Sequence, residues 1–301
     1  MPTLESLKRR LESVDDLHSV VKTMKAMAAV NIRQFEKNAA ALEHYRETVE
    51  LGFQAVMRRQ PQTLVGAQAA PQKDIVAIVF GSDQGMCGRL NEKIVDHVLT
   101  YLENRRRGRS NPDVMVVGQR AAGRLEDRGR SVNDLFGVPL AQSGVTPLVR
   151  RLLFNIEARL ADKGPQPVHL FYCRYLKGAA FEPHRVQLLP LDRRWLENVQ
   201  KKIWPGPSLP LFTMNQNELF SALVRQYLTI SLASAAVESL ASENASRLAA
   251  MQGAEKSIED QRQELEGAFH RQRQMAITEE LLDIVAGFEA LKKPDATDAR
   301  A

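Results

Sequence analysis

The stretch closest to a chemical site is a glycine-rich loop, Gly81-Ser82-Asp83-Gln84-Gly85-Met86-Cys87-Gly88. A loop of this kind between a strand and a helix can aim backbone N–H groups at a phosphate. However, the two common nucleotide-binding spacings, G-x-x-x-x-G-K-[ST] and G-x-G-x-x-G, are both missing, and no lysine follows the last glycine to meet a terminal phosphate. We therefore interpret the loop as a structural turn and expect no bound cofactor.

Cysteine and histidine suggest little further chemistry. Cys87 lies near a predicted helix start, where a thiol can become a nucleophile through a lowered pKa. No histidine lies near it in the sequence, so we favour a buried structural thiol. Cys173 and the six scattered histidines form no metal-ligand spacing. We predict no catalytic residue and no metal site.

The charge balance is mildly basic, with a formal net charge of +5 and a pI of about 9.2. Most basic residues alternate with acidic ones along predicted helices, which is typical of solvated helix faces. The only dense basic run is Arg105, Arg106, Arg107 and Arg109, and it lacks the interleaved aromatic residues of a single-strand binder. We interpret it as a solvated loop, with an acidic protein surface or lipid headgroups as the second reading, and we expect no nucleic-acid partner.

The candidate loop must be positioned by an α/β fold. Residues 75–80 are a continuous apolar run, typical of a strand covered on both faces, and they directly precede the loop. Apolar runs at 114–117 and 168–175 predict further strands, and amphipathic patterns at 91–104, 121–128 and 147–161 predict helices between them. Residues 185–190 are expected to form an edge strand. This alternation predicts a small, mostly parallel, Rossmann-like sheet.

The longest predicted element runs from Asn215 to Lys293, with no proline and few glycines. Asn215 is a suitable N-cap, and Pro294 forbids continuation of the helix. At 1.5 Å per residue this helix would be on the order of 110 Å long. Its apolar residues recur at steps of three and four, so they form one stripe that needs a partner: Leu219, Leu223, Ile230, Val237, Leu240, Leu248, Met251, Ile258, Leu265 and Phe269.

The N-terminal residues supply that partner. A heptad that starts at Leu4 gives mostly apolar positions as far as Val56, and a repeat near 3.5 predicts a left-handed coiled coil. Three positions of this seam are polar, namely His18, Lys25 and Arg46. We expect their neighbours to replace them in the seam, and these are Leu17, Met24 and Tyr45. The two terminal helices should therefore form an antiparallel coiled coil around the α/β domain.

If the chain returns antiparallel, the last turns of the C-terminal helix protrude alone. These turns carry apolar residues on more than one face, between Arg273 and Val285. An apolar tip without a partner in its own chain predicts a sleeve supplied by another protein.

Several segments resemble the gamma subunit of F-type ATP synthases, over nearly the full length. Residues 22–29, KTMKAMAA, are similar to K-x-M-x-M-V-A-A, and the loop from Ser82 with Leu90 and Asn91 is similar to S-D-[RK]-G-L-C-G-x-L-N. Residues 187–191, QLLPL, match the strand that closes the domain. Residues 238–251 resemble E-x-x-x-S-E-x-x-x-R-x-x-A-M, and residues 273–281 resemble R-Q-x-x-I-T-x-E-L.

The resemblance implies a rotor without chemistry of its own. It implies a central stalk that turns inside an α₃β₃ hexamer and couples ion flow through the membrane sector to ATP synthesis or hydrolysis on the α and β subunits. Arg273, Gln274 and Thr278 are the implied polar contacts with the β subunits, and Met24 with Lys25 is implied to lie near the β lever region. The α/β domain would meet the epsilon subunit and the ring of c subunits, with the complex peripheral to the cytoplasmic face of a bacterial plasma membrane.

This reading divides the chain into an N-terminal coiled-coil helix (1–60), a central α/β domain (73–212), a C-terminal coiled-coil helix (213–293) and a disordered tail (294–301). Val30 and Asn31 replace the family's usual serine and lysine, which suggests a divergent or alternate F-type complex. Two alternatives remain open. One is a non-catalytic coiled-coil scaffold or adaptor with an α/β head, and the other is a nucleotide-dependent enzyme that uses the Gly81 to Gly88 loop.

Overall fold

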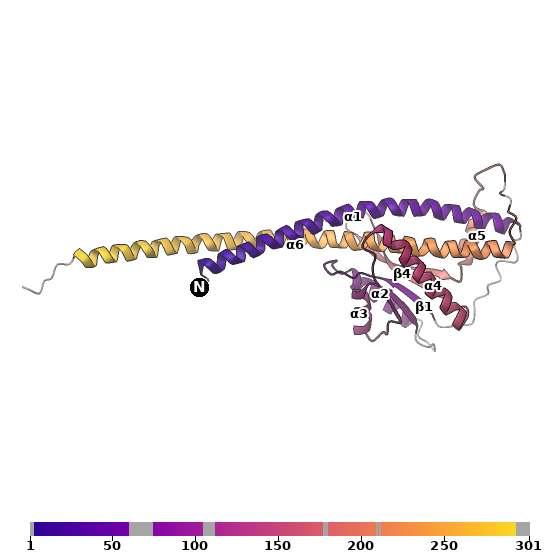
Figure 1. Ribbon diagram of the computed structural model, residues 1–301, viewed down its shortest axis with the longest axis horizontal. Helices are drawn as coiled ribbons and strands as arrows, with labels where there is room; N and C mark the ends of the chain where they lie inside the picture. The colour runs from indigo at the N-terminus through magenta and orange to yellow at the C-terminus, as the bar shows by residue number, and fades with distance from the viewer. Residues whose placement is uncertain are drawn as a thin grey trace, which may run out of the picture. The chain divides into compact units, whose positions relative to one another are not determined.

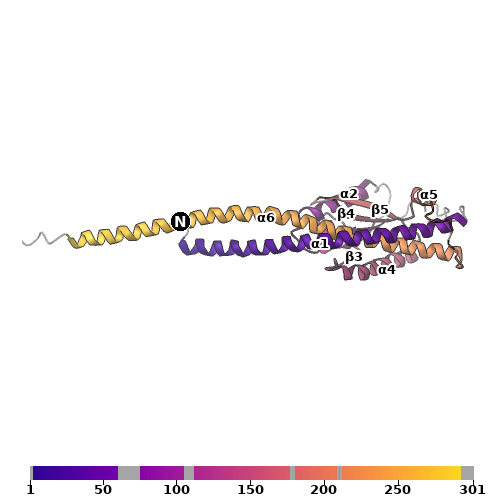
Figure 2. The same cartoon turned by 90° about the horizontal axis from the view of Figure 1, so that it is seen from above.

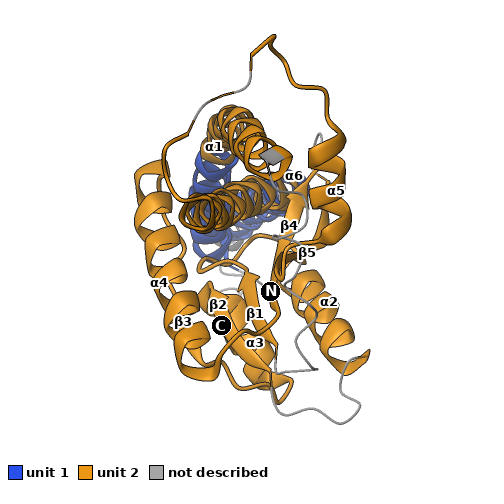
Figure 3. Cartoon of the chain, turned by 90° about the vertical axis from the view of Figure 1, so that its right-hand side faces the viewer, with its two compact units in different colours: residues 1–25, 251–301 blue, residues 26–250 orange. Residues whose placement is uncertain are grey.

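The computed structural model describes residues 3–59, 75–104, 112–176, 180–208, 210 and 212–292. These residues fall into two compact units (Figure 3). Residues 26–250 form one unit, and residues 1–25 with 251–301 form the other. The linker at 60–74, the Arg105 to Arg109 run and the predicted tail lie outside the described residues. The division into four segments therefore stays a prediction.

The two terminal helices are α1 (Leu4–Arg59) and α6 (Gln216–Lys292). Asn215 caps α6, because its Oδ1 accepts a hydrogen bond from the backbone N–H of Asn217 at 2.9 Å. Within each unit the helices run side by side and antiparallel (Figures 1 and 2). The pairs that establish this direction are Asp15 with Arg262, Lys25 with Glu255, Arg46 with Ser234, and Val56 with Gln216.

The heptad seam of α1 keeps its register through its polar positions. Every predicted seam position from Leu4 to Val56 is buried or half-buried. The expectation that neighbours replace the polar seam residues is wrong for Leu17 and Tyr45, which are 57% and 45% exposed. One residue along a helix is a turn of about 100°, so moving Leu17 into the seam would take the residues before and after it out. The long side chains of Lys25 and Arg46 stay instead and reach polar partners on α6.

The sheet has five strands in the order β3-β2-β1-β4-β5. The strands β1 (Val76–Phe80), β2 (Asp113–Val117), β3 (Asp134–Phe136) and β4 (Val168–Tyr175) are parallel. Strand β5 (Phe181–Leu189) is antiparallel to β4 and lies at the edge. The continuous apolar runs are explained by burial, because every residue of β1 and β2 is buried.

Helices cover both faces of this sheet (Figure 3). Helices α2 (Leu90–Asn104) and α3 (Gln119–Asp127) pack on one face, in a core that includes Val79 and Val116. Helix α4 (Val145–Lys163) packs on the other face together with α6 and part of α1, in a core that includes Ile78. The predicted mixed α/β fold with a coiled coil of terminal helices is therefore confirmed.

A third apolar cluster joins the C-terminal end of α1 to the start of α6 and to α5 (Arg193–Lys201). Phe53 is fully buried there and makes edge-to-face contacts with Trp195 and Phe220, with ring centroids 5.5 and 5.6 Å apart. The sequence did not predict α5, nor the short strand β3.

Part of α6 is long and apolar enough to satisfy a composition test for a membrane span, with a mean hydropathy of 1.2. This is weak evidence for a span, because core helices of soluble proteins satisfy the same test. Within the unit of residues 26–250, α6 packs against the sheet, α1 and α4.

Candidate functional site

Of the residues implied to contact a partner, Met24 and Lys25 lie at the α1–α6 seam. Both are half-buried. The Nζ of Lys25 donates a hydrogen bond to Glu255 Oε2 at 2.5 Å. This bond lowers the pKa of Glu255, and nearby Lys25, His18 and Lys22 charges act in the same direction. Lys25 therefore braces the two helices, and its charge is already matched within the chain.

The other implied contact residues lie on α6. Arg273, Gln274 and Thr278 are all exposed. Thr278 uses its hydroxyl to donate to the backbone carbonyl of Gln274 at 2.8 Å, so its methyl group and oxygen are held in one orientation. Gln274 and Thr278 also line one shallow hollow of about 510 Å³. The structure thus brings Gln274 and Thr278 together, whereas Arg273 lies on a neighbouring face of the helix.

Apolar side chains surround these polar residues. Seven large ones in the last turns are about half exposed or more: Met275, Ile277, Leu281, Leu282, Ile284, Val285 and Phe288. At 100° per residue they occupy roughly half of the helix circumference, whereas a helix that packs on one neighbour needs a stripe of about 100°. Gln274 and Thr278 fall inside this apolar arc and Arg273 borders it. We call residues 273–288 the apolar tip.

A second part of α6 shows the opposite pattern. Five polar residues are buried there, and we call them the polar belt: Ser242, Glu243, Asn244, Ser246 and Arg247. Sequence reasoning recognised this motif but assigned it no role. The signal that could have given one is the run of alanine and serine from 231 to 250, because small side chains on every face indicate a helix approached closely from several sides.

The polar belt fastens α6 to three neighbouring elements. Ser242 donates to the backbone carbonyl of Cys173 in β4 at 2.8 Å. Ser246 donates to the carbonyl of Cys87 in the glycine-rich loop at 2.5 Å. Asn244 accepts from the amide of Asn31 on α1 at 3.3 Å. These bonds fix both the rotation and the axial position of α6 against the sheet, the loop and α1.

The belt also holds an ion pair. Arg247 Nη2 donates to Glu243 Oε1 at 2.6 Å, and the two side chains are only 9% and 7% exposed. Within the described chain, Glu243 Oε2 and Arg247 Nε have no hydrogen-bond partner. Burial raises the pKa of Glu243, and this effect exceeds the lowering by the hydrogen bond from Arg247. The pair is therefore costly to break.

Polar groups of the glycine-rich loop form hydrogen bonds within the fold. The backbone N–H of Ser82 donates to Asn91 Oδ1 at 3.0 Å, and the amide of Asn91 donates back to the Ser82 hydroxyl at 2.7 Å. The Asp83 carboxylate accepts from the backbone N–H groups of Gln119 and Val138, at 2.8 and 2.7 Å. These bonds support the structural interpretation of the loop, since Asp83 also supplies an anion at the N-terminus of α3.

The two cysteines are free and buried. Burial raises the pKa of Cys173 to about 12, so this thiol is not a nucleophile near neutral pH. Among the residues that the structure describes, no group of three or more His, Cys, Asp or Glu side chains is placed to hold a metal ion.

Comparison with known proteins identifies the family. The sequence profile of the family described as "ATP synthase" matches residues 3–291. The chain belongs to the ATP synthase family.

Its relatives in this family are similar over their whole length. The chain is 25% identical over 320 residues to the ATP synthase gamma chain of Synechococcus sp. (strain PCC 6716), covering 97% of this chain and all of that one. It is 24% identical over 285 residues to the ATP synthase gamma chain of Ruminococcus albus, covering 94% and 97%. The resemblance read from the motifs is thereby confirmed.

Solved structures show the same fold. A chain of the Euglena gracilis mitochondrial ATP synthase aligns with a TM-score of 0.63 at 18% identity, covering 99% of this chain and 98% of that one. A chain of the central stalk and c-ring of the Tetrahymena thermophila mitochondrial ATP synthase aligns with a TM-score of 0.57 at 20% identity, covering 78% and 99%.

Proposed function

We propose that this chain is the central-stalk gamma subunit of an F-type ATP synthase. In this role it turns inside a hexamer of three α and three β subunits and couples ion flow through the membrane sector to ATP synthesis or hydrolysis on those subunits. The observation that carries the proposal is the apolar tip, which exposes a wide apolar surface that the described residues of the chain leave uncovered. Family membership over residues 3–291 supports it.

The mechanism needs no reaction on this chain. A single shaft at the centre of a three-fold hexamer touches three otherwise equivalent β subunits differently, so each is biased toward a different nucleotide affinity. Rotation exchanges these biases, which is a coupling of binding equilibria through differential contacts. An apolar surface suits a turning contact, because it has no directional bonds that must break at each angle. The subunit is accordingly non-catalytic.

The proposed site residues divide this work. Gln274 and Thr278 present polar groups within the apolar arc, and Arg273 presents a charge at its border, so the three act as the points of grip on the β subunits. Met24 and Lys25 lie at the β lever region, where the Lys25–Glu255 ion pair keeps the two helices together under load. The remaining partners are the epsilon subunit and the c-ring, with the complex peripheral to the cytoplasmic face of a bacterial plasma membrane.

The two alternatives explain fewer of the observations. A nucleotide-dependent enzyme would need free N–H donors in the glycine-rich loop, where the Ser82 N–H already donates to Asn91 within the fold. A scaffold or adaptor would use the same coiled coil, but it gives no reason for polar residues at one-turn spacing within an apolar tip.

The test is assembly and turnover with the α and β subunits of the same genome. Co-expression of the full chain should yield an α₃β₃γ complex with ATPase activity. Truncation after Gln272 should change turnover or its coupling, whereas truncation after Lys292 is the matched control and should not. Failure of the full chain to assemble with its own α and β subunits would refute the proposal and favour the scaffold.

A further inference from the structure

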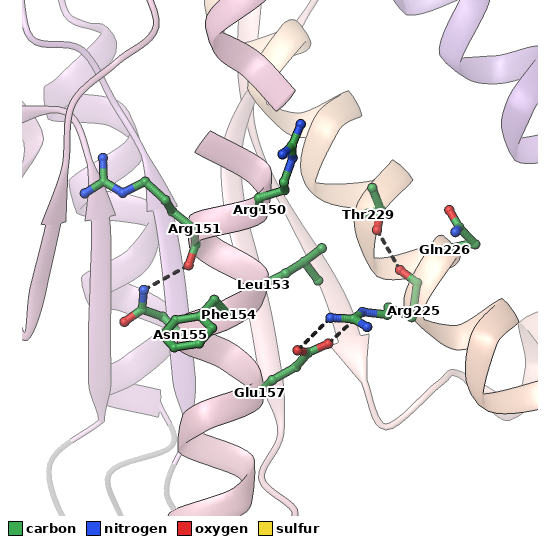
Figure 4. Close-up of a pocket in the computed structure, with 9 residues that line it drawn as sticks. All are labelled: Arg150, Arg151, Leu153, Phe154, Asn155, Glu157, Arg225, Gln226 and Thr229. Atoms are coloured by element: carbon green, nitrogen blue, oxygen red, sulfur yellow. Dashed lines mark hydrogen bonds and ion pairs between the residues drawn. The ribbon is translucent and has the colours of Figure 1, made fainter. Parts of the chain in front are cut away.

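A groove between α4 and α6 is a hollow that the proposed rotor function leaves unused (Figure 4). It lies within the unit of residues 26–250 and has a volume of about 780 Å³. Its lining comes from nine residues: Arg150, Arg151, Leu153, Phe154, Asn155, Glu157, Arg225, Gln226 and Thr229.

An exposed aromatic residue stands at this groove. Phe154 on α4 is 72% exposed, while its neighbour Leu153 is buried against the sheet and α6. A large apolar side chain that is exposed beside a hollow is typical of an interface anchor, because a partner can bury it. Figure 4 shows Leu153 turned toward α6, and Phe154 is among the residues that line the groove.

Two arginines of α4 lie near Phe154, and their side chains point in different directions. Arg150 lies one turn before Phe154 on the same face of α4. Among the described residues no carboxylate lies within ion-pair distance of Arg150, and Figure 4 shows its side chain on the α6 side of α4. Arg151, in contrast, turns away and places its guanidinium 5.2 Å from the centre of the Phe136 ring. Arg150 is thus an unmatched positive charge at one end of the groove.

The other end holds an ion pair that fixes its shape. Arg225 of α6 makes two bonds to Glu157 of α4, each of 3.0 Å. This forked geometry holds the guanidinium in one plane across the gap between the helices. On the α6 side, Gln226 is held by a hydrogen bond from the Tyr45 hydroxyl at 3.0 Å. The groove is therefore formed before any partner binds, which lowers the entropic cost of binding.

We propose that this groove docks an acidic segment of a partner protein. In this arrangement a carboxylate of the segment pairs with Arg150, an apolar side chain covers Phe154, and a polar group meets the exposed edge of the Arg225–Glu157 pair. The charge favours an acidic occupant, because the Glu157 carboxylate is neutralised by Arg225 and Arg150 remains as an unmatched positive charge in the lining. The inference is independent of the rotor function, since it concerns a different face of the chain.

Site-specific photocrosslinking tests the proposal in cells that express the full chain with its native partners. A benzophenone amino acid replaces Phe154, and the same replacement at Leu140, which is 88% exposed outside the groove, is the control. Position 154 should crosslink to one protein segment that contains Asp or Glu near the crosslinked residue, and position 140 should not. A crosslink to lipid, to a basic or uncharged segment, or to no single product would overturn the proposal.

Charge reversal provides the second measurement. Arg150→Glu should reduce the yield of the 154 crosslink at least tenfold, and Arg150→Lys should retain most of it. Arg151→Glu changes the net charge equally but alters a guanidinium that turns away from the groove, so it should have a smaller effect. Equal losses for the two reversals would contradict the proposed pairing. Because the readout is a crosslink at one position, it is separable from assembly with α and β subunits and from ATPase turnover.

Discussion

Replacing Arg247 by methionine should destabilise the fold strongly, because it leaves a buried carboxylate without its partner. The Glu243–Arg247 pair has side-chain exposures of 7% and 9% and a bond of 2.6 Å. Breaking such a buried pair from one side costs about 3–5 kcal/mol. With a urea m-value of about 3 kcal/mol/M, the unfolding midpoint should fall by roughly 1–1.7 M. The measurement is urea unfolding of the purified chain at pH 8, followed by circular dichroism.

The same variant should recover part of its stability in acid. Arg247 opposes the rise that burial causes in the pKa of Glu243, so its removal raises that pKa further above the ordinary value of 4.5. The folded variant then binds the proton more tightly than the unfolded chain does. The variant's loss of folding stability is therefore greatest above the raised pKa of Glu243 in the folded state, and it decreases as the pH falls toward 4.5. The loss of stability at pH 5 should therefore be smaller than the loss at pH 8.

Two further variants decide whether burial is the cause. Arg9→Met removes a pair with the same spacing and orientation, Glu5 with Arg9 at 2.7 Å, whose side chains are both 76% exposed. That loss should be under about 0.5 kcal/mol. A double variant, Glu243→Met with Arg247→Met, removes both charges and should be more stable than Arg247→Met alone. A loss for Arg247→Met as small as that for Arg9→Met, at every pH, would refute the reasoning.

The remaining predictions concern a thiol, two glycines and the seam. Cys173 should resist thiol reagents at pH 8 until urea unfolds the chain, because burial raises its pKa to about 12; fast labelling of the folded chain would contradict this. Gly118 has φ 113° and an added Cβ would lie 2.7 Å from Ser82 N, so Gly118→Ala should cost about 2–4 kcal/mol in urea unfolding. Gly253→Ala, in α6 with no atom within 4 Å of the added Cβ, should instead stabilise by about 0.5–1 kcal/mol. Lys25→Met should keep the helices paired in thermal unfolding, whereas Lys25→Glu should lower the midpoint by placing two carboxylates together.

The coiled coil could be predicted because its repeat extends over many turns. The heptad from Leu4 placed every seam position on the buried side, and its polar members are where the local reasoning failed. Replacing His18 by Leu17 in the seam is sensible for one turn taken alone. It is excluded by the turns on either side, because a helix cannot rotate at a single residue.

The elements that escaped prediction are those with short or mixed patterns. Strand β3 has three residues, which is too short to show a period of two, and it forms only by pairing with β2. Helix α5 follows a proline and contains charged residues on most of its surface, so only Leu196 and Val199 mark its buried side. In both cases tertiary packing supplies the information.

The candidate site was predicted unevenly for the same reason. The motif at 273–281 identified Arg273, Gln274 and Thr278, but it did not separate the two that share a hollow from the one that does not, because that depends on helix phase. The α4–α6 groove was not predicted, since Arg150 and Phe154 are far from Arg225 in sequence. The sequence instead indicated the run from Arg105 to Arg109 as a possible contact surface, because those arginines are close together in the sequence.

The polar belt and the apolar tip show how one helix can carry two different surfaces. Around the belt, strand β4, the glycine-rich loop and α1 all approach α6, so close packing requires small side chains, and their hydroxyls must find partners once water is excluded. In the tip the reverse holds, because large apolar side chains remain exposed over about half the circumference. A helix stabilised only by its own chain would place its apolar residues in the first region and its polar residues in the second. This reversed distribution of polar and apolar residues is explained if the two regions have different roles. The polar belt prevents rotation of α6 against its own chain, and the apolar tip is covered by another protein, as the proposed rotor function requires.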